Sequence, residues 1–142
     1  DNRIKSDAYL FIARSSISLG NKKKALNAYK KLENGSNKEF AVEALYYKAM
    51  DNFDNKEYLN SNLIIEQISN EFSGYKKWTA KSLLLMSKNF YQLGDAFQAS
   101  FILESVIENF SHMPDIVDNA KNELTKIKRI ESEKNSSVEI NN

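Results

Sequence analysis

Three segments of this 142-residue chain resemble one another, and their regular spacing constrains the fold more than any other feature. Residues 9–32, 45–68 and 83–106 align without gaps. The aligned small residues Ala25, Ser61 and Ala99 lie 36 and 38 residues apart, so the length difference falls between the segments. Self-similarity at such a period is typical of stacked structural repeats whose joins are surface loops.

Each segment has the pattern of two helices joined by a tight turn. Apolar residues recur every three or four positions, and strict alternation is nowhere sustained, so helices are predicted and strands are not. Gly20 and Gly94 stand where a first helix ends with positive φ, and Asn21 and Asp95 follow as residues that begin a helix. We therefore expect repeats over residues 6–35, 40–72 and 77–110.

A further helix is predicted after the third repeat, over residues 114–132. Pro114 suits a first helical turn, and an apolar stripe that includes Ala120 and Ile127 fits a helix that caps the exposed side of the third repeat. From about Glu133 the chain is polar and aperiodic, so residues 133–142 are predicted to be a disordered tail. The expected organisation is one all-α domain over residues 1–132, followed by this tail.

The three units resemble tetratricopeptide repeats. That motif places a small residue on the first helix, where this chain has Ala13, Ala49 and Ser87, and another on the second helix, where it has Ala25, Ser61 and Ala99. The chain departs from the motif at its leading Trp, replaced by Tyr9, Leu45 and Leu83, and it lacks the closing Pro. The resemblance implies a right-handed α-solenoid of three hairpins, with the C-terminal helix as a cap.

Residues 75–110 also look like the terminal repeat of large tetratricopeptide proteins of Gram-negative bacteria, which are often exported to the periplasm. The similar residues include Tyr75, Trp78 and the run from Gly94 to Ala99. The resemblance implies a protein-interaction scaffold at the C-terminal end of a longer protein, within a periplasmic or cell-envelope assembly. A cytoplasmic location is equally compatible with a chain that has no Cys.

In such a solenoid the first helices line a concave face, which is the predicted binding surface for a segment of another protein. The residues expected on this face are Leu10, Arg14, Ile17, Tyr46, Met50, Phe53, Leu84, Lys88 and Tyr91. Their aromatic and basic side chains suit a peptide with apolar anchors and acidic residues. The alternative is that these aromatic residues simply pack between helices.

The composition argues against several other functions. A formal net charge of +1 gives no electrostatic basis for nucleic-acid binding, and no apolar run is long enough to cross a membrane. The lysines at positions 22–24 are interpreted as a solvated helix face. The one His, His112, and the nearby Asp115 are too few ligands for a metal site, and no nucleophile motif occurs. We expect no enzyme activity, cofactor or metal.

Two other roles remain open from the sequence. One is a structural end-piece or a subunit of a larger complex, docking through its N-terminal edge and its last helix. The other is an accessory domain of an enzyme. Trp78 is interpreted as packing under the join that precedes the third repeat, rather than as a contact for a partner.

Overall fold

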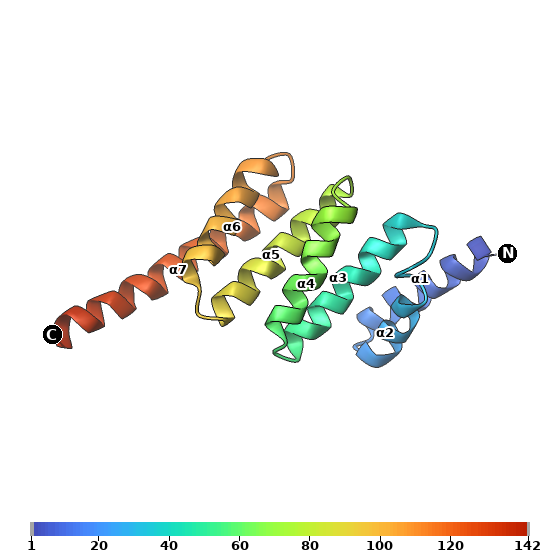
Figure 1. Ribbon diagram of the computed structural model, residues 1–142, viewed down its shortest axis with the longest axis horizontal. Helices are drawn as coiled ribbons and strands as arrows, with labels where there is room; N and C mark the ends of the chain where they lie inside the picture. Colours follow the sequence, from blue (N-terminus) through green and yellow to red (C-terminus); the bar gives the residue numbers. More distant parts are fainter. Residues whose placement is uncertain (1, 142) are drawn as a thin grey trace. The chain divides into compact units, whose positions relative to one another are not determined.

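The protein is all-α over residues 2–141, the part of the chain that the structure describes. Within this range the computed structural model has seven helices and no strand, which confirms the predicted fold class (Figure 1). The helices are α1 (Asn2–Ser18), α2 (Lys22–Lys30), α3 (Lys38–Asp54), α4 (Tyr58–Glu71), α5 (Lys76–Gln92), α6 (Ala96–Asn109) and α7 (Pro114–Asn141).

The predicted repeats coincide with the pairs α1–α2, α3–α4 and α5–α6. Helix α1 packs on α2, α2 on α3, and α3 on α4, while α6 packs on α7. The chain separates into two compact units at Ser82 and Leu83, inside α5, where the sequence predicted one domain. The first unit holds α1 to α4 and the first turns of α5, and the second holds the rest; each is described separately below.

The turn inside each hairpin has the same backbone conformation. Gly20 and Gly94 have φ values of 73° and 83°, as predicted, and Lys56 occupies the equivalent place in the middle hairpin with φ of 62°. Positive φ is natural for Gly and strained for Lys, because a Cβ atom then crowds the following carbonyl oxygen. The middle hairpin therefore keeps the turn of its neighbours at a cost in backbone strain.

The residue after each turn begins the second helix. The side chains of Asn21 and Asp95 accept hydrogen bonds from the backbone N–H groups of Lys24 (3.2 Å) and Gln98 (3.0 Å), as predicted for N-caps. Glu57 stands at the equivalent position before α4 and makes no such side-chain bond. The middle hairpin thus lacks both the Gly at the turn and the side chain that caps the second helix.

Each hairpin carries one small, buried residue on each of its helices, at the same positions of the repeat. These pairs are Ala13 and Ala25, Ala49 and Ser61, and Ser87 and Ala99. In the two pairs that contain Ser, its hydroxyl donates to the backbone carbonyl of the Ala on the opposite helix, at 2.8 and 3.0 Å. Small side chains let the helices approach closely, and the hydrogen bonds satisfy the buried hydroxyls.

A hydrophobic core joins the first hairpin to α3. It consists of Leu10, Ala13, Ala28, Tyr29, Leu32 and Ala44. Phe40 and Tyr47 of α3 pack against this core. Burial of these apolar surfaces is what holds α3 against α2. In the second unit, α6 contributes Leu103 and Val106, and α7 contributes Ala120 and Ile127, all buried.

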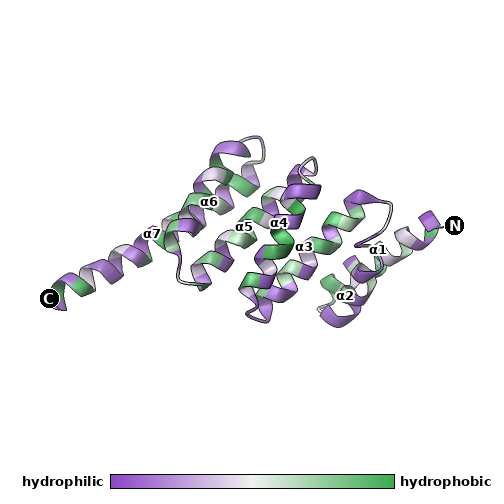
Figure 2. Cartoon of the chain, viewed as in Figure 1, coloured by the Kyte–Doolittle hydropathy of each residue, from purple (hydrophilic) through white to green (hydrophobic). Residues whose placement is uncertain are grey.

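Helix α7 continues through Asn141, so residues 133–141 are helical where a disordered tail was predicted; residue 142 lies outside the described range. Hydrophilic residues prevail along its outer half (Figure 2), which is the reason the pattern was misinterpreted. No Gly or Pro follows Pro114. Local pairs also support the helix, with Lys134 lying 3.3 Å from Glu131 and Arg129 lying 4.0 Å from Glu133.

Candidate functional site

The first unit contains a buried carboxylate held by donors from the preceding hairpin. The side chain of Glu43, on α3, is 3% exposed. Its two oxygens accept from Nε and Nη2 of Arg14 at 3.0 and 2.7 Å, and from the hydroxyl of Tyr29 at 2.7 Å. Both oxygens are thus paired or hydrogen-bonded, as a buried carboxylate requires. Arg14 is therefore positioned by Glu43.

Tyr29 and Arg14 both remain hydrogen-bond donors near neutral pH. Burial, and then the hydrogen bond to Glu43, raise the pKa of the Tyr29 hydroxyl well above its usual range, so Tyr29 remains a donor. The hydrogen bond to Glu43 raises the pKa of Arg14. One positive charge and one negative charge thus neutralise each other at this place.

Aromatic rings form a continuous cluster beside the network. Tyr29 and Tyr47 are stacked, with ring centroids 4.9 Å apart and planes 9° apart. Tyr46 contacts Tyr47 at 5.2 Å and Trp78 at 5.5 Å. Stacked and tilted arrangements of this kind are favourable beyond their burial of apolar area. The cluster connects α2, α3 and the start of α5 within the first unit.

Two lysines of α5 lie against these rings without an acidic partner. The Lys81 ammonium is 4.8 Å from the centroid of the Trp78 ring and 5.0 Å from that of Tyr46, and Lys77 is 5.1 Å from Trp78. No carboxylate within residues 2–141 lies within 4 Å of either ammonium group. Burial, and then repulsion from Lys77, lower the pKa of Lys81. Positive charge is therefore held here without full compensation.

These groups surround an open cleft of about 330 Å³. Its lining consists of Arg14, Ile17, Ser18, Tyr29, Glu43, Tyr47, Lys77, Trp78 and Lys81. Three cationic side chains and one carboxylate face it, so the cleft carries a formal excess of two positive charges. Unpaired ammonium groups that lie on aromatic rings are suited to a carboxylate attached to an apolar segment. We refer to it as the basic cleft.

The structure gives different places to the predicted concave-face residues of the first unit. Arg14 and Ile17 line the basic cleft. Tyr46 lies behind it and is buried, at 7% exposure, and Leu10 belongs to the core. Met50 and Phe53 are half-buried farther along α3, where the Phe53 ring contacts Tyr58 at 5.6 Å.

The remaining predicted residues lie in the second unit. Leu84 is buried and Lys88 is exposed. Tyr91 is half-buried and contacts α7: its hydroxyl donates to Glu131 at 3.4 Å, and the Lys134 ammonium lies 5.8 Å from its ring. The chain's own last helix therefore occupies part of the surface around Tyr91.

Sequence reasoning missed Glu43, Tyr47 and Lys81. A signal for Glu43 was present, because it is a lone carboxylate within the otherwise apolar run from Phe40 to Leu45. Trp78 is buried, as predicted, and its ring contacts those of Tyr46 and Tyr47.

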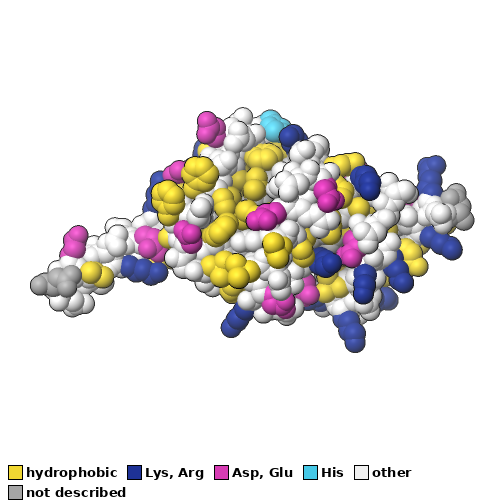
Figure 3. Space-filling model, viewed as in Figure 1, with side chains coloured by type: hydrophobic (Ala, Val, Ile, Leu, Met, Phe, Trp, Pro, Cys, Tyr) yellow, Lys and Arg dark blue, Asp and Glu magenta, His cyan; other side chains and the backbone are white. Residues whose placement is uncertain are grey.

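The other surfaces of the described chain offer less for chemistry. Within residues 2–141 no three His, Cys, Asp or Glu side chains are grouped to hold a metal ion, and no helix is long and apolar enough to cross a membrane. Lys22 is exposed, as expected, and it also pairs at the surface with Asp54 at 2.7 Å and Asp51 at 3.1 Å on α3. Hydrophobic side chains gather over α6 on the face shown in Figure 3, where Phe97 is 80% exposed.

Comparisons of the chain with protein-family models, with curated proteins and with solved structures give no match.

Proposed function

We propose that this chain is a non-enzymatic protein-binding scaffold whose basic cleft holds an acidic side chain of a partner segment. The observation that carries the proposal is the pair Lys77 and Lys81, which lie on aromatic rings at an open cleft with no acidic partner in the described chain. A Glu or Asp carboxylate of the partner accepts hydrogen bonds from both ammonium groups. The apolar residues beside it contact Ile17 and the ring of Trp78.

The cleft is suited to binding because its walls are already ordered. Glu43 holds Arg14 at one side, and the stacked rings fix Tyr47 and Trp78 at the other. A surface that is organised before binding loses little conformational freedom when the partner arrives. The unpaired lysines also attract an acidic segment over a distance, which raises the rate of association at low salt.

For the arrangement of the hairpins we propose the right-handed α-solenoid that the tetratricopeptide resemblance implies. The repeated turn conformation and the repeated pairs of small residues support it, because both recur at the spacing of the sequence repeats. The same resemblance leads us to propose an envelope assembly as the setting. The partner is then a protein segment of that assembly.

The test uses pairs of fluorescein-labelled dodecapeptides that differ only in a central Glu or Gln, flanked by Leu and Tyr. Fluorescence anisotropy measures their binding to the full chain. We expect the Glu peptides to bind more tightly, and the double variant Lys77→Gln/Lys81→Gln to weaken them about tenfold, roughly what the loss of two partly exposed charge contacts costs. The matched control is Lys23→Gln/Lys30→Gln, which removes two exposed lysines of α2 outside the cleft. Equal binding of Glu and Gln peptides, or equal loss in both double variants, would contradict the proposal.

A further inference from the structure

The interface between α2 and α3 has a counterpart on α1 that nothing in the described chain covers. The repeat spacing of 36 residues relates α1 to α3, since Ala13 corresponds to Ala49, and Gly20 to Lys56 with its similar φ. Any residue of α3 that faces the first hairpin therefore has an equivalent on α1. That equivalent points to the side from which a preceding hairpin would approach.

Besides ion pairs at the surface, four residues of α3 make the apolar, aromatic and buried-carboxylate contacts with the first hairpin. Ala44 belongs to the core of the first hairpin, and Phe40 packs against that core. The Tyr47 ring stacks on the Tyr29 ring. The Glu43 carboxylate accepts hydrogen bonds from Tyr29 and Arg14. The interface thus combines apolar contact, one aromatic stack and one carboxylate with two kinds of donor.

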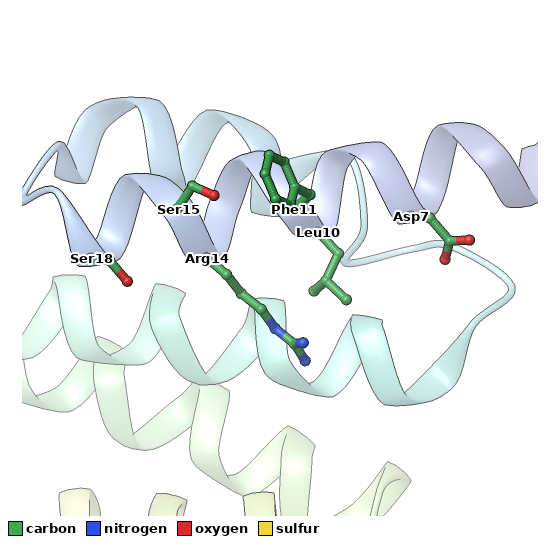
Figure 4. Close-up of a pocket in the computed structure, with 6 residues that line it drawn as sticks. All are labelled: Asp7, Leu10, Phe11, Arg14, Ser15 and Ser18. Carbon is green, nitrogen blue, oxygen red and sulfur yellow. The ribbon is translucent and has the colours of Figure 1, made fainter.

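The equivalents on α1, 36 residues earlier, are Ile4, Asp7, Ala8 and Phe11. All four are exposed, with Ile4 at 67% and Phe11 at 73%. Within residues 2–141 Asp7 has no ion pair or side-chain hydrogen bond, and Phe11 has no ring contact. Figure 4 shows Asp7 and Phe11 projecting from α1 at an open groove of about 410 Å³, which Leu10, Arg14, Ser15 and Ser18 also line. The face thus presents two large exposed apolar side chains, Ile4 and Phe11, together with the carboxylate of Asp7.

We propose that this face of α1, formed by Ile4, Asp7, Ala8 and Phe11, docks a helical hairpin of a partner protein that presents a Tyr ring and an Arg guanidinium. The occupant's chemistry is that of the interface already formed between the first hairpin and α3. The partner's ring stacks on Phe11, and its hydroxyl and guanidinium donate to Asp7. The face lies on α1 alone and does not depend on the peptide binding proposed for the basic cleft.

A second copy of this chain does not offer the required groups. Its Tyr29 and Arg14 are already bound to its own Glu43, and its Tyr29 ring is already stacked on its own Tyr47. Using them for docking would leave the buried carboxylate of Glu43 without donors, which is strongly unfavourable. A hairpin that docks on this face must therefore present a Tyr and an Arg that are not already paired.

The experiment supplies the stated chemistry with a probe of known sequence. An additional copy of residues 2–37, placed directly before Asn2 of the full chain, keeps the spacing of 36 residues and brings a Tyr29 and an Arg14 to the face of α1. Hydrogen exchange then measures the protection of the amides of α1. We expect the added hairpin to raise that protection. A double-mutant cycle between Phe11→Ala in the chain and Tyr29→Ala in the added copy should show a coupling of about 2- to 12-fold, the range measured for aromatic pairs.

The control cycle uses Phe97→Ala in place of Phe11→Ala, because Phe97 of α6 is similarly exposed. It should show no coupling with Tyr29→Ala of the added copy. Unchanged protection of α1, or a cycle with no coupling, overturns the proposal. Sedimentation of the unextended chain tests whether a second copy binds this face instead. A dimer that Phe11→Arg dissociates would show that it does, and would overturn the proposal. Binding of Glu peptides to the basic cleft is measured separately with Lys77 and Lys81 intact, so the two proposals fail independently.

Discussion

Replacing Lys56 by Gly should stabilise the protein, because the turn between α3 and α4 has a conformation that Lys adopts poorly. The left-handed region costs a residue with a Cβ atom about 1–2 kcal/mol, and the greater freedom of Gly in the unfolded chain offsets about 0.4–1 kcal/mol of that gain. The net expected increase in the free energy of unfolding is about 0.5–1 kcal/mol, equivalent to roughly 2–4 °C in Tm for a chain of this size.

The two other hairpins provide the reverse experiment. Gly20 and Gly94 have the same positive φ, and a Cβ atom added to either meets no atom within 4 Å. Gly20→Ala and Gly94→Ala therefore introduce backbone strain without a steric clash. Each should lower the free energy of unfolding by about 0.5–1 kcal/mol.

Urea unfolding followed by far-UV circular dichroism measures all three variants, with Lys56→Ala as the control. That variant removes the charged side chain and keeps the strain, so its stability should stay close to that of the unaltered chain. The reasoning is refuted if Lys56→Ala stabilises the protein as much as Lys56→Gly. It is also refuted if Lys56→Gly has no effect while the two Gly→Ala changes destabilise.

Two further predictions follow from the caps and the buried tyrosines. Asn21→Ala removes a hydrogen bond to the N-terminus of α2 and should lower the free energy of unfolding by about 1 kcal/mol. Glu57→Asp adds such a bond at the N-terminus of α4 and should raise the free energy of unfolding by about 0.5 kcal/mol. Thermal unfolding compares the two variants with the unaltered chain. Burial raises the pKa of Tyr46 to about 12, against about 10 in an unfolded chain, so the stability that this proton supplies is complete below pH 10 and is lost as the pH rises to 12. Between pH 10 and pH 12, urea titrations should show that the free energy of unfolding falls by roughly 2–3 kcal/mol less in Tyr46→Phe than in the unaltered chain. An equal fall in both would contradict the raised pKa of Tyr46.

The repeats made most of the helices predictable from sequence, because short-range patterns determine them. Gly20 and Gly94 marked two turns by their need for positive φ, and Asn21 and Asp95 marked the helix starts that follow. The outer half of α7 was not predictable in the same way. It has no sustained apolar stripe, and it contains no Gly or Pro and carries local charged pairs that favour a helix.

The candidate site was less predictable, because it depends on which side chains meet across helices. Arg14 and Ile17 were expected on a binding face, and both line the basic cleft. Tyr46 was expected there too, but Trp78 and Lys81 cover it. The pairing of Glu43 with Tyr29 joins residues 14 positions apart, and no local pattern indicates such a contact.

The pairs of small residues have a consequence for how relatives of this chain should be compared. The hydroxyl that bridges two helices belongs to the second helix in the pair Ala49 and Ser61, and to the first helix in the pair Ser87 and Ala99. Either helix of a hairpin can thus supply the donor. An alignment scored column by column would register tolerance of both Ala and Ser at each position. Scored as pairs, the same columns would show which helix supplies the hydroxyl where one is present, since the pair Ala13 and Ala25 has none.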